Sequence, residues 1–196
     1  MTRKAMVTRT TNETDIQITL DLDGAGQVDA ATGIGFFEHM LQAFGRHGMF
    51  DLRVDAKGDL QVDGHHTVED TGIVLGQAFA QALGDKRGIR RFGSIALPMD
   101  EALVLAAVDI SGRGALYWDV DVPYVMVGDF DATLAREFFI AFAANAGITL
   151  HIRQLAGDNV HHVLEACFKA AARALRDAVE LDPRAGEALP STKGAL

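Results

Sequence analysis

Two copies of the pattern His-His-x-x-Glu are the strongest chemical signal in the sequence. They occur in the segments DGHHTVEDTG and NVHHVLEACF. On a helix, the first histidine and the glutamate four residues later share a face, whereas the second histidine points about 100° away. Each doublet can therefore serve two different metal ions, and two doublets predict two metal sites. The ligands expected from the two patterns are His65, His66, Glu69, His161, His162 and Glu165.

This donor set indicates the kind of metal. Imidazole nitrogens combined with carboxylate oxygens suit Mn²⁺, Fe²⁺, Co²⁺ or Zn²⁺, and the lack of thiolate ligands disfavours a closed structural zinc site. A site of this kind keeps open positions for a substrate. The alternative interpretation is two polar helix starts with solvated imidazoles, but histidine is not a preferred helix cap.

A duplication in the chain points to further ligands. When the segments FFEHM and AREFF are aligned, His39 falls opposite Glu137, and each could complete one metal site. His151 competes with Glu137, but its counterpart in the same alignment is Arg53, which cannot bind a metal ion. We therefore prefer Glu137, and His47 keeps a structural interpretation.

The elements that must position these side chains follow the same order twice: strand, helix, strand, helix. The opening segments NETDIQITLDLDGAG and DEALVLAAVDISGRG align Glu13 with Glu101 and Asp21 with Asp109. The next segments, FFEHMLQAFGRHG and REFFIAFAANAG, have helical spacing of apolar residues. Gly48 and Gly147 are predicted to end these helices as left-handed caps.

The strand-like segments MFDLRVDAKGD and ITLHIRQLAGD then lead into the two histidine doublets and long helices. We expect an α+β fold of two pseudo-symmetric strand-helix repeats, similar to ferredoxin-like or ribosomal S5 domain 2-like halves. Helices should cover one face of each sheet. The expected division is 1–95 for the first repeat and 96–196 for the second with a C-terminal substrate-binding tail, in one integrated catalytic domain.

Composition limits the classes of partner. The 196 residues include 18 Lys and Arg against 27 Asp and Glu, and the formal charge of -9 disfavours nucleic-acid binding. No segment approaches the roughly 20 apolar residues of a membrane span, so we expect no membrane association and a cytoplasmic location. Cys167 lies in the helical segment HHVLEACFKAAARAL, where a buried apolar role is expected.

Seven segments in order resemble the imidazoleglycerol-phosphate dehydratase family: RTTNETDI, GIGFFEHML, DGHHTVEDTG, RFGSIALPMDEAL, DISGRG, HHVLEACFKAAARAL and LPSTKGAL. The match covers nearly the whole chain. It implies a hydro-lyase of histidine biosynthesis that converts imidazoleglycerol phosphate to imidazoleacetol phosphate and water. It also implies a homo-oligomer of 24 subunits built from trimers, with active sites between subunits.

The resemblance further implies two Mn²⁺ ions per active site, and many relatives have histidine where this chain has Glu137. The implied ligands of the first ion are His65, His161, Glu165 and Glu137, and those of the second are His39, His66, Glu69 and His162. Two metals, one at each ring nitrogen, would hold the substrate imidazole as an imidazolate that expels the adjacent hydroxyl. Glu13 matches the family's glutamate for proton transfer, and Glu101, beside Asp100, is a weaker alternative.

Phosphate binding is the last role that the resemblance implies. Arginine's planar fork matches phosphate oxygens, and a lysine flanked by hydroxyl groups can also hold an anion. Two rival functions stay open: another dinuclear metal enzyme such as a hydrolase, and a non-catalytic metal-binding assembly protein. The residues implied for the phosphate are Arg91, Arg113, Lys169, Ser191, Thr192 and Lys193.

Overall fold

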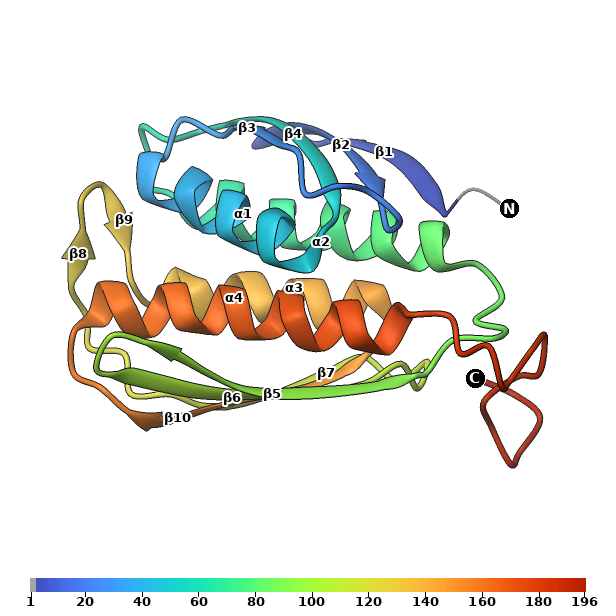
Figure 1. Cartoon of the computed structure of the whole chain (residues 1–196). Helices are drawn as coiled ribbons and strands as arrows, with labels where there is room; N and C mark the ends of the chain where they lie inside the picture. The colour runs from blue at the N-terminus through green and yellow to red at the C-terminus, as the bar shows by residue number, and fades with distance from the viewer. Residues whose placement is uncertain (1–2) are drawn as a thin grey trace.

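Two four-stranded sheets enclose four helices in the computed structural model of the chain, which describes residues 3–196 (Figure 1). The first sheet has the order β1-β2-β4-β3 and the second the order β5-β6-β10-β7. The first repeat consists of β1 (Lys4–Thr10), β2 (Thr14–Asp21), β3 (Val28–Ala31), α1 (Gly35–Gly48), β4 (Asp51–Gly58) and α2 (His65–Leu83). The second consists of β5 (Phe92–Met99), β6 (Ala102–Asp109), β7 (Ala115–Asp119), α3 (Leu134–Ala146), β10 (Thr149–Ala156) and α4 (Val160–Val179), with the short hairpin β8 (Met126–Val127) and β9 (Phe130–Asp131) before α3.

The two sheets have the same topology, which confirms the expected α+β fold with repeated strand-helix halves. In each sheet three strands are antiparallel, and the remaining edge strand, β3 or β7, runs parallel to its neighbour. Glu13 and Glu101 each stand directly before the second strand of their repeat, as the alignment predicts. The second sheet begins with β5 at Phe92, so the first four residues of this strand precede the expected division after residue 95.

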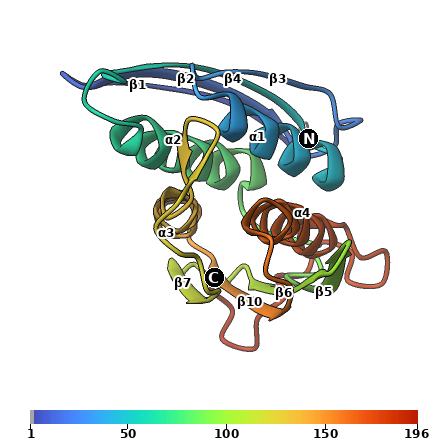
Figure 2. The same cartoon turned by 90° about the vertical axis from the view of Figure 1, so that its left-hand side faces the viewer.

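The helices form the middle layers of the molecule, because each sheet buries one face beneath them. Alternate residues of β2, namely Ile16, Ile18 and Leu20, are buried, and their neighbours in the strand face outward. Figure 2 shows α1 and α2 beneath one sheet and α3 and α4 against the other. Helix α1 packs against α4, and α2 packs against α3. The core is therefore shared between the two repeats.

Glycines let α2 and α3 approach closely and show that both helices run in the same direction. A Cβ atom at Gly72 would lie 2.6 Å from the carbonyl oxygen of Phe138, and one at Gly76 would lie 2.6 Å from that of Phe142. Four residues further along α2, the contact has moved four residues further along α3. The two helices are therefore parallel, and their first turns lie at the same end. The first turns carry the histidines and glutamates of interest.

One of the two predicted helix caps is wrong. Gly147 ends α3 with a φ of 65°, as expected, but α1 includes Gly48 and is ended by Met49 with a φ of 57°. Gly48 is needed for a different reason, since a Cβ atom there would lie 2.5 Å from the ring of Phe50. Close packing, not backbone conformation, therefore selects this glycine.

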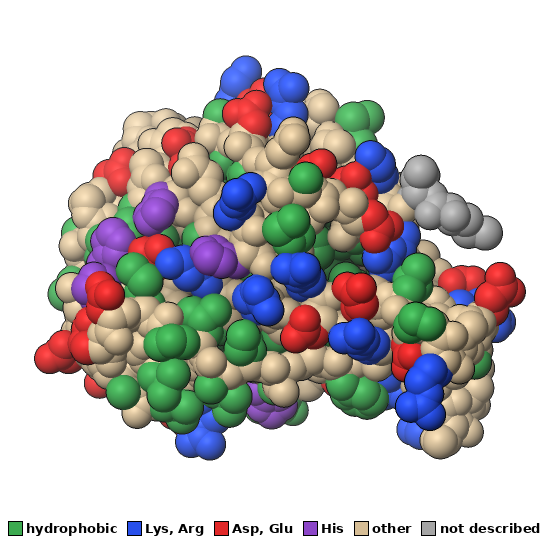
Figure 3. Space-filling view, in the orientation of Figure 1, with side chains coloured by type: hydrophobic (Ala, Val, Ile, Leu, Met, Phe, Trp, Pro, Cys, Tyr) green, Lys and Arg blue, Asp and Glu red, His purple; other side chains and the backbone are tan. Residues whose placement is uncertain are grey.

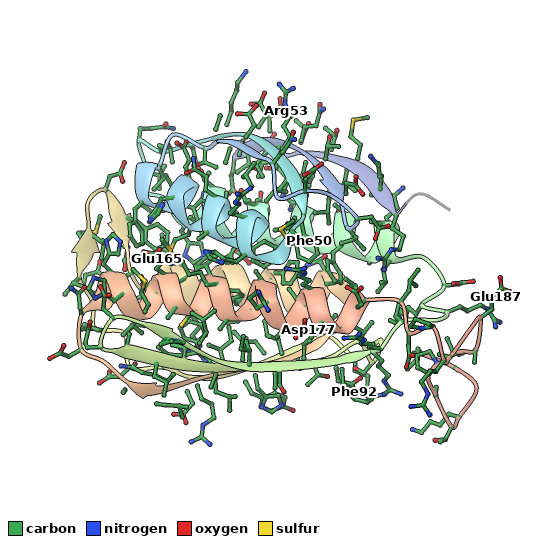
Figure 4. All side chains as sticks on the ribbon, in the orientation of Figure 1. Phe50, Arg53, Phe92, Glu165, Asp177 and Glu187 are labelled. Atoms are coloured by element: carbon green, nitrogen blue, oxygen red, sulfur yellow. The ribbon has the colours of Figure 1, made fainter. Side chains whose placement is uncertain are left out.

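The outer faces of the two sheets differ in character. On the first sheet most exposed positions are polar, among them Gln17 and Thr19 on β2 and Arg53 on β4, and Met6 of β1 is an apolar exception. On the second sheet Leu105 and Ala107 of β6 face outward, and Phe92 is 58% exposed. Figure 4 shows Arg53 and Phe92 pointing outward from opposite sheets. No helix within residues 3–196 is long and apolar enough to cross a membrane.

Candidate metal centre

Three side chains from α1 and α4 converge into a possible metal-binding group. The Nε2 atoms of His39 and His161 lie 3.5 Å and 3.3 Å from Oε2 of Glu165. Candidate ligand atoms of the three residues all lie within 4.8 Å of one another. Glu165 is labelled in Figure 4, between α1 and α4, and Figure 3 shows histidine side chains gathered among acidic ones near the same end of the molecule. Two imidazoles and one carboxylate can thus face a single ion.

Glu165 is held as a carboxylate although it is largely buried. Its burial alone would raise the pKa, but the hydrogen bond and charge of Lys169, together with His39, outweigh burial and lower the pKa of Glu165 below its usual range. The Nζ atom of Lys169 lies 2.6 Å from Oε1, which leaves Oε2 facing the two histidines. An anionic oxygen is therefore available to a cation.

A second group of candidate ligands lies between α2 and α3. Nε2 of His65 is 3.3 Å from Oε2 of Glu69, the fourth neighbour along α2. A Cβ atom at Gly64 would lie 3.4 Å from Leu134, so the starts of α2 and α3 are in contact. Glu137, one helical turn after Leu134, lies half-buried in the first turn of α3. Among residues 3–196, only His39, His161 and Glu165 bring three candidate ligand atoms within 4.8 Å of one another, and His65 and Glu69 form a pair.

Within one chain, helix pairing decides which expected ligands are neighbours. His39 lies with His161 and Glu165, because α1 packs against α4. Glu137 lies on α3, which packs against α2. Each helix pair therefore combines one helix from each repeat, and the two ligand sets that the resemblance implies stay a prediction about the assembly.

The second histidine of each doublet points away from its neighbour and meets a carboxylate through Nδ1. Nδ1 of His162 lies 2.8 Å from Oε2 of Glu101, and Nδ1 of His66 lies 3.0 Å from Oδ2 of Asp59. These hydrogen bonds are the main cause of the raised pKa of both histidines, and the same bond lowers the pKa of Glu101. Both Nε2 atoms face the opposite way.

Asp59 was missed by the sequence analysis. It follows directly after β4 and precedes the first doublet by six residues, so a search for a carboxylate between strand and histidine helix could have found it. The pair His66 and Asp59 also has Glu13 nearby, with Oε1 3.8 Å from Nε2 of His66. Glu13 therefore lies beside the first doublet.

The residues expected to bind phosphate are divided between two places. Arg91 donates hydrogen bonds to both carboxylate oxygens of Asp109 and to the carbonyl oxygen of Pro190, so it lies against the tail. Arg113 is 3.9 Å from Asp109 and 68% exposed. In the tail, the hydroxyl of Ser191 donates to the carbonyl of Ala195 and accepts from the backbone N–H of Lys193. The expected residues at this end are Arg91, Arg113, Ser191, Thr192 and Lys193.

Lys169 lies elsewhere, beside Glu165. The backbone N–H of Arg91 donates to Ala178 at the end of α4, whereas His161 lies at its start. At 1.5 Å per residue, these two positions on α4 are about 25 Å apart. One chain alone therefore does not bring all the expected phosphate-binding groups to its own metal ligands.

Two further histidines have other surroundings. His151 stacks on Tyr117 with ring centroids 4.4 Å apart on the outer face of the second sheet, away from α3 and α4. His47 is half-buried on α1, where burial first and the charges of Lys169 and Arg173 next lower its pKa. The described structure therefore places neither with His161 and Glu165.

The sequence profile of imidazoleglycerol-phosphate dehydratases matches residues 32–175. The chain belongs to the imidazoleglycerol-phosphate dehydratase family. The relative from Acidiphilium cryptum is 64% identical over 196 residues and covers 100% of both chains, and that from Gluconacetobacter diazotrophicus is 63% identical over 194 residues, 99% of this chain and 98% of its own. Both carry the name imidazoleglycerol-phosphate dehydratase.

Two solved structures agree with this assignment. Imidazoleglycerol-phosphate dehydratase from Staphylococcus aureus has 38% identity and a TM-score of 0.83, covering 91% of this chain and 99% of its own. The enzyme from Pyrococcus furiosus, solved in complex with (S)-C348, has 39% identity and a TM-score of 0.83, covering 97% and 100%. The chain is thus a hydro-lyase by family, and the imidazoleglycerol-phosphate dehydratase fold extends over nearly its whole length.

Proposed function

We propose that the protein dehydrates imidazoleglycerol phosphate to imidazoleacetol phosphate in cytoplasmic histidine biosynthesis, with two Mn²⁺ ions per active site. Membership of the dehydratase family supports the reaction. The observation that carries the metal requirement is the convergence of His39, His161 and Glu165. This mixture of nitrogen and oxygen donors fits a divalent transition metal such as Mn²⁺.

Each ion would be held by ligands that the assembly brings together from different copies. The proposed ligands of one ion are His65, His161, Glu165 and Glu137, and those of the other are His39, His66, Glu69 and His162. When bound, the ions would supply positive charge that stabilises negative charge developing on the substrate's imidazole ring.

Glu13 is the proposed proton carrier. Its side chain is 54% exposed, and Oε1 lies 3.8 Å from Nε2 of His66. Its backbone is fixed, because its N–H donates to the hydroxyl of Thr11 and its carbonyl accepts from Asp59. Within residues 3–196 no hydrogen bond is made to its carboxylate. A free carboxylate on a fixed turn can take a proton from carbon and return it to a leaving hydroxyl.

Distances within one chain support the proposal of a homo-oligomer. The metal ligands at the start of α4 and the tail beside its end are about 25 Å apart, too far for one small substrate to span. The phosphate would therefore be bound by residues of another copy, with Arg113, which is 68% exposed, as one candidate cation. The apolar outer face of the second sheet offers a surface for such contacts. The assembly we propose has 24 subunits built from trimers, as the resemblance implies.

The decisive experiment is a product assay with metal control. Metal-free protein incubated with imidazoleglycerol phosphate should be inactive, and added Mn²⁺ should restore formation of imidazoleacetol phosphate. Release of inorganic phosphate in place of the acetol phosphate would favour the rival hydrolase. Metal binding without either product would favour the metal-binding assembly protein.

The role of Glu13 is tested in the same assay. The substitution Glu13→Gln should keep both ions but lower turnover by roughly 100-fold or more, the scale of a lost general acid or base. Metal content and turnover are measured on the same preparation, with Asp15→Asn, on the exposed side of β2, as a control. Wild-type turnover in Glu13→Gln would exclude this role.

A further inference from the structure

We infer that Glu101 and Asp59 are positioning residues, which fix the rings of His162 and His66 so that each presents Nε2 to a metal ion. The inference rests on the metal-dependent function proposed above. It is supported by the two Nδ1 contacts, 2.8 Å from His162 to Glu101 and 3.0 Å from His66 to Asp59. The two carboxylates come from unrelated positions in the two repeats.

The two repeats bring a carboxylate to the second histidine from different elements. Asp59 follows β4, and because β10 has a bulge between Gln154 and Ala156, its counterpart after β10 is Asp158. Asp158 is exposed, and within residues 3–196 no hydrogen bond joins it to His162. In the second repeat the carboxylate comes from the turn between β5 and β6, which supplies Glu101.

Glu101 is itself fixed at both oxygens. Oε1 accepts a hydrogen bond from the backbone N–H of Asn159, the cap of α4, and Oε2 contacts Nδ1 of His162. The side chain of Asn159 in turn accepts from the N–H groups of His161 and His162. The turn, the cap and the histidine doublet therefore form one connected hydrogen-bond network. Such a network limits rotation of the imidazole ring.

The two equivalent glutamates have thus taken different positions. Glu13 stands on the Nε2 side of His66, whereas its counterpart Glu101 stands on the Nδ1 side of His162. When the N–H group at Nδ1 donates to a carboxylate, the lone pair at Nε2 is free for a metal ion. The same hydrogen bond makes Nε2 a stronger ligand. Glu101 is therefore suited to orient a ligand, and Glu13 to move protons.

The test measures Mn²⁺ affinity of the full-length protein by calorimetry and by electron paramagnetic resonance. Glu101→Ala should weaken one class of site by about 10- to 100-fold, the usual loss for a partner of a ligating histidine. Glu101→Gln should retain most of the affinity, because its carbonyl still accepts the Nδ1 proton. Asp59→Ala and Asp59→Asn should behave in the same way through His66.

Matched controls separate positioning from general damage. Glu180→Ala removes an exposed glutamate just after α4 and should leave Mn²⁺ affinity unchanged. The visible spectrum of the Co²⁺-loaded protein should change in Glu101→Ala and return to the wild-type form in Glu101→Gln. Unfolding temperatures of the metal-free variants should match that of Glu180→Ala.

The outcomes distinguish this inference from the proposed function. If wild-type protein binds Mn²⁺ and turns over substrate while Glu101→Ala and Asp59→Ala bind the metal equally well, the positioning role is excluded and the proposed function stands. Equal losses in the alanine and amide variants would also exclude it, because the hydrogen bond would then not matter. If wild-type protein bound no metal, both proposals would fail.

Discussion

The two repeats have the same strand order but present different surfaces and different ligands. The outer face of the first sheet carries polar residues such as Gln17, whereas the corresponding strand of the second sheet carries Leu105 and Ala107. His39 on α1 corresponds to Glu137 on α3, and Nδ1 of the second histidine meets Asp59 in the first repeat but Glu101 in the second. The duplication thus preserves the backbone that brings ligands together, while individual side chains have been free to specialise.

The largest effect on turnover is expected from substitutions that test whether both repeats supply metal ligands. Glu165→Gln and Glu69→Gln each replace an anionic ligand by a neutral amide, and each should lower turnover more than about 100-fold, beyond the usual loss for an outer partner. Bound manganese and kcat/KM are measured together. If one substitution left both unchanged, the comparison between the repeats would break, because only one group would bind a functional ion.

The outer sheet faces are compared by placing a charge on each. Leu105→Glu should disrupt the proposed assembly, since an uncompensated charge buried in an interface costs several kcal/mol. Gln17→Glu, on the polar face of the first sheet, should leave the assembly intact. Sedimentation velocity gives the size of each variant, and circular dichroism checks the fold. Equal assembly of both variants would show that the second sheet's face is not an interface.

The packing of α2 against α3 is tested by making α2 resemble α4. Gly76 corresponds to Ala172, yet Gly76→Ala should lower the free energy of unfolding by about 1–3 kcal/mol, because the added methyl group would press on the α3 backbone. Gly35→Ala is the control, since a Cβ atom there has nothing within 4 Å. Denaturant unfolding measures both. A stabilised Gly76→Ala would mean that helix propensity outweighs the close contact.

The smallest effect, a change in metal preference, is expected when either of the equivalent residues His39 and Glu137 is replaced by the residue type of the other. Carboxylates favour Mn²⁺ and imidazoles favour Zn²⁺, so Glu137→His should lower the ratio of Mn²⁺ to Zn²⁺ affinity about tenfold, or ~1.4 kcal/mol. The reciprocal His39→Glu should raise it. Competition titration with both metals measures the ratio. An unchanged ratio in both variants would indicate that these positions do not bind the ions.

Much of the fold could be predicted from periodicity and duplication. Alternation in β2 and helical spacing in α1 follow from local geometry, so the order of elements and the positions of Glu13 and Glu101 before their strands are visible in the sequence. The burial of Cys167, whose pKa is raised by loss of solvent, follows from its apolar helix face. The ending of α1 at Met49 could not be predicted, because the ring of Phe50 selects Gly48.

By itself the sequence determined which residue types could bind a metal and which of them share a helix face, because spacing along one helix fixes their direction. Only the tertiary structure decided that His39 meets Glu165, more than a hundred residues away, and that Glu101 meets His162. Those contacts depend on which helices pack together and on where a turn reaches. Such choices result from the summed packing of both repeats, which no short pattern in the chain encodes.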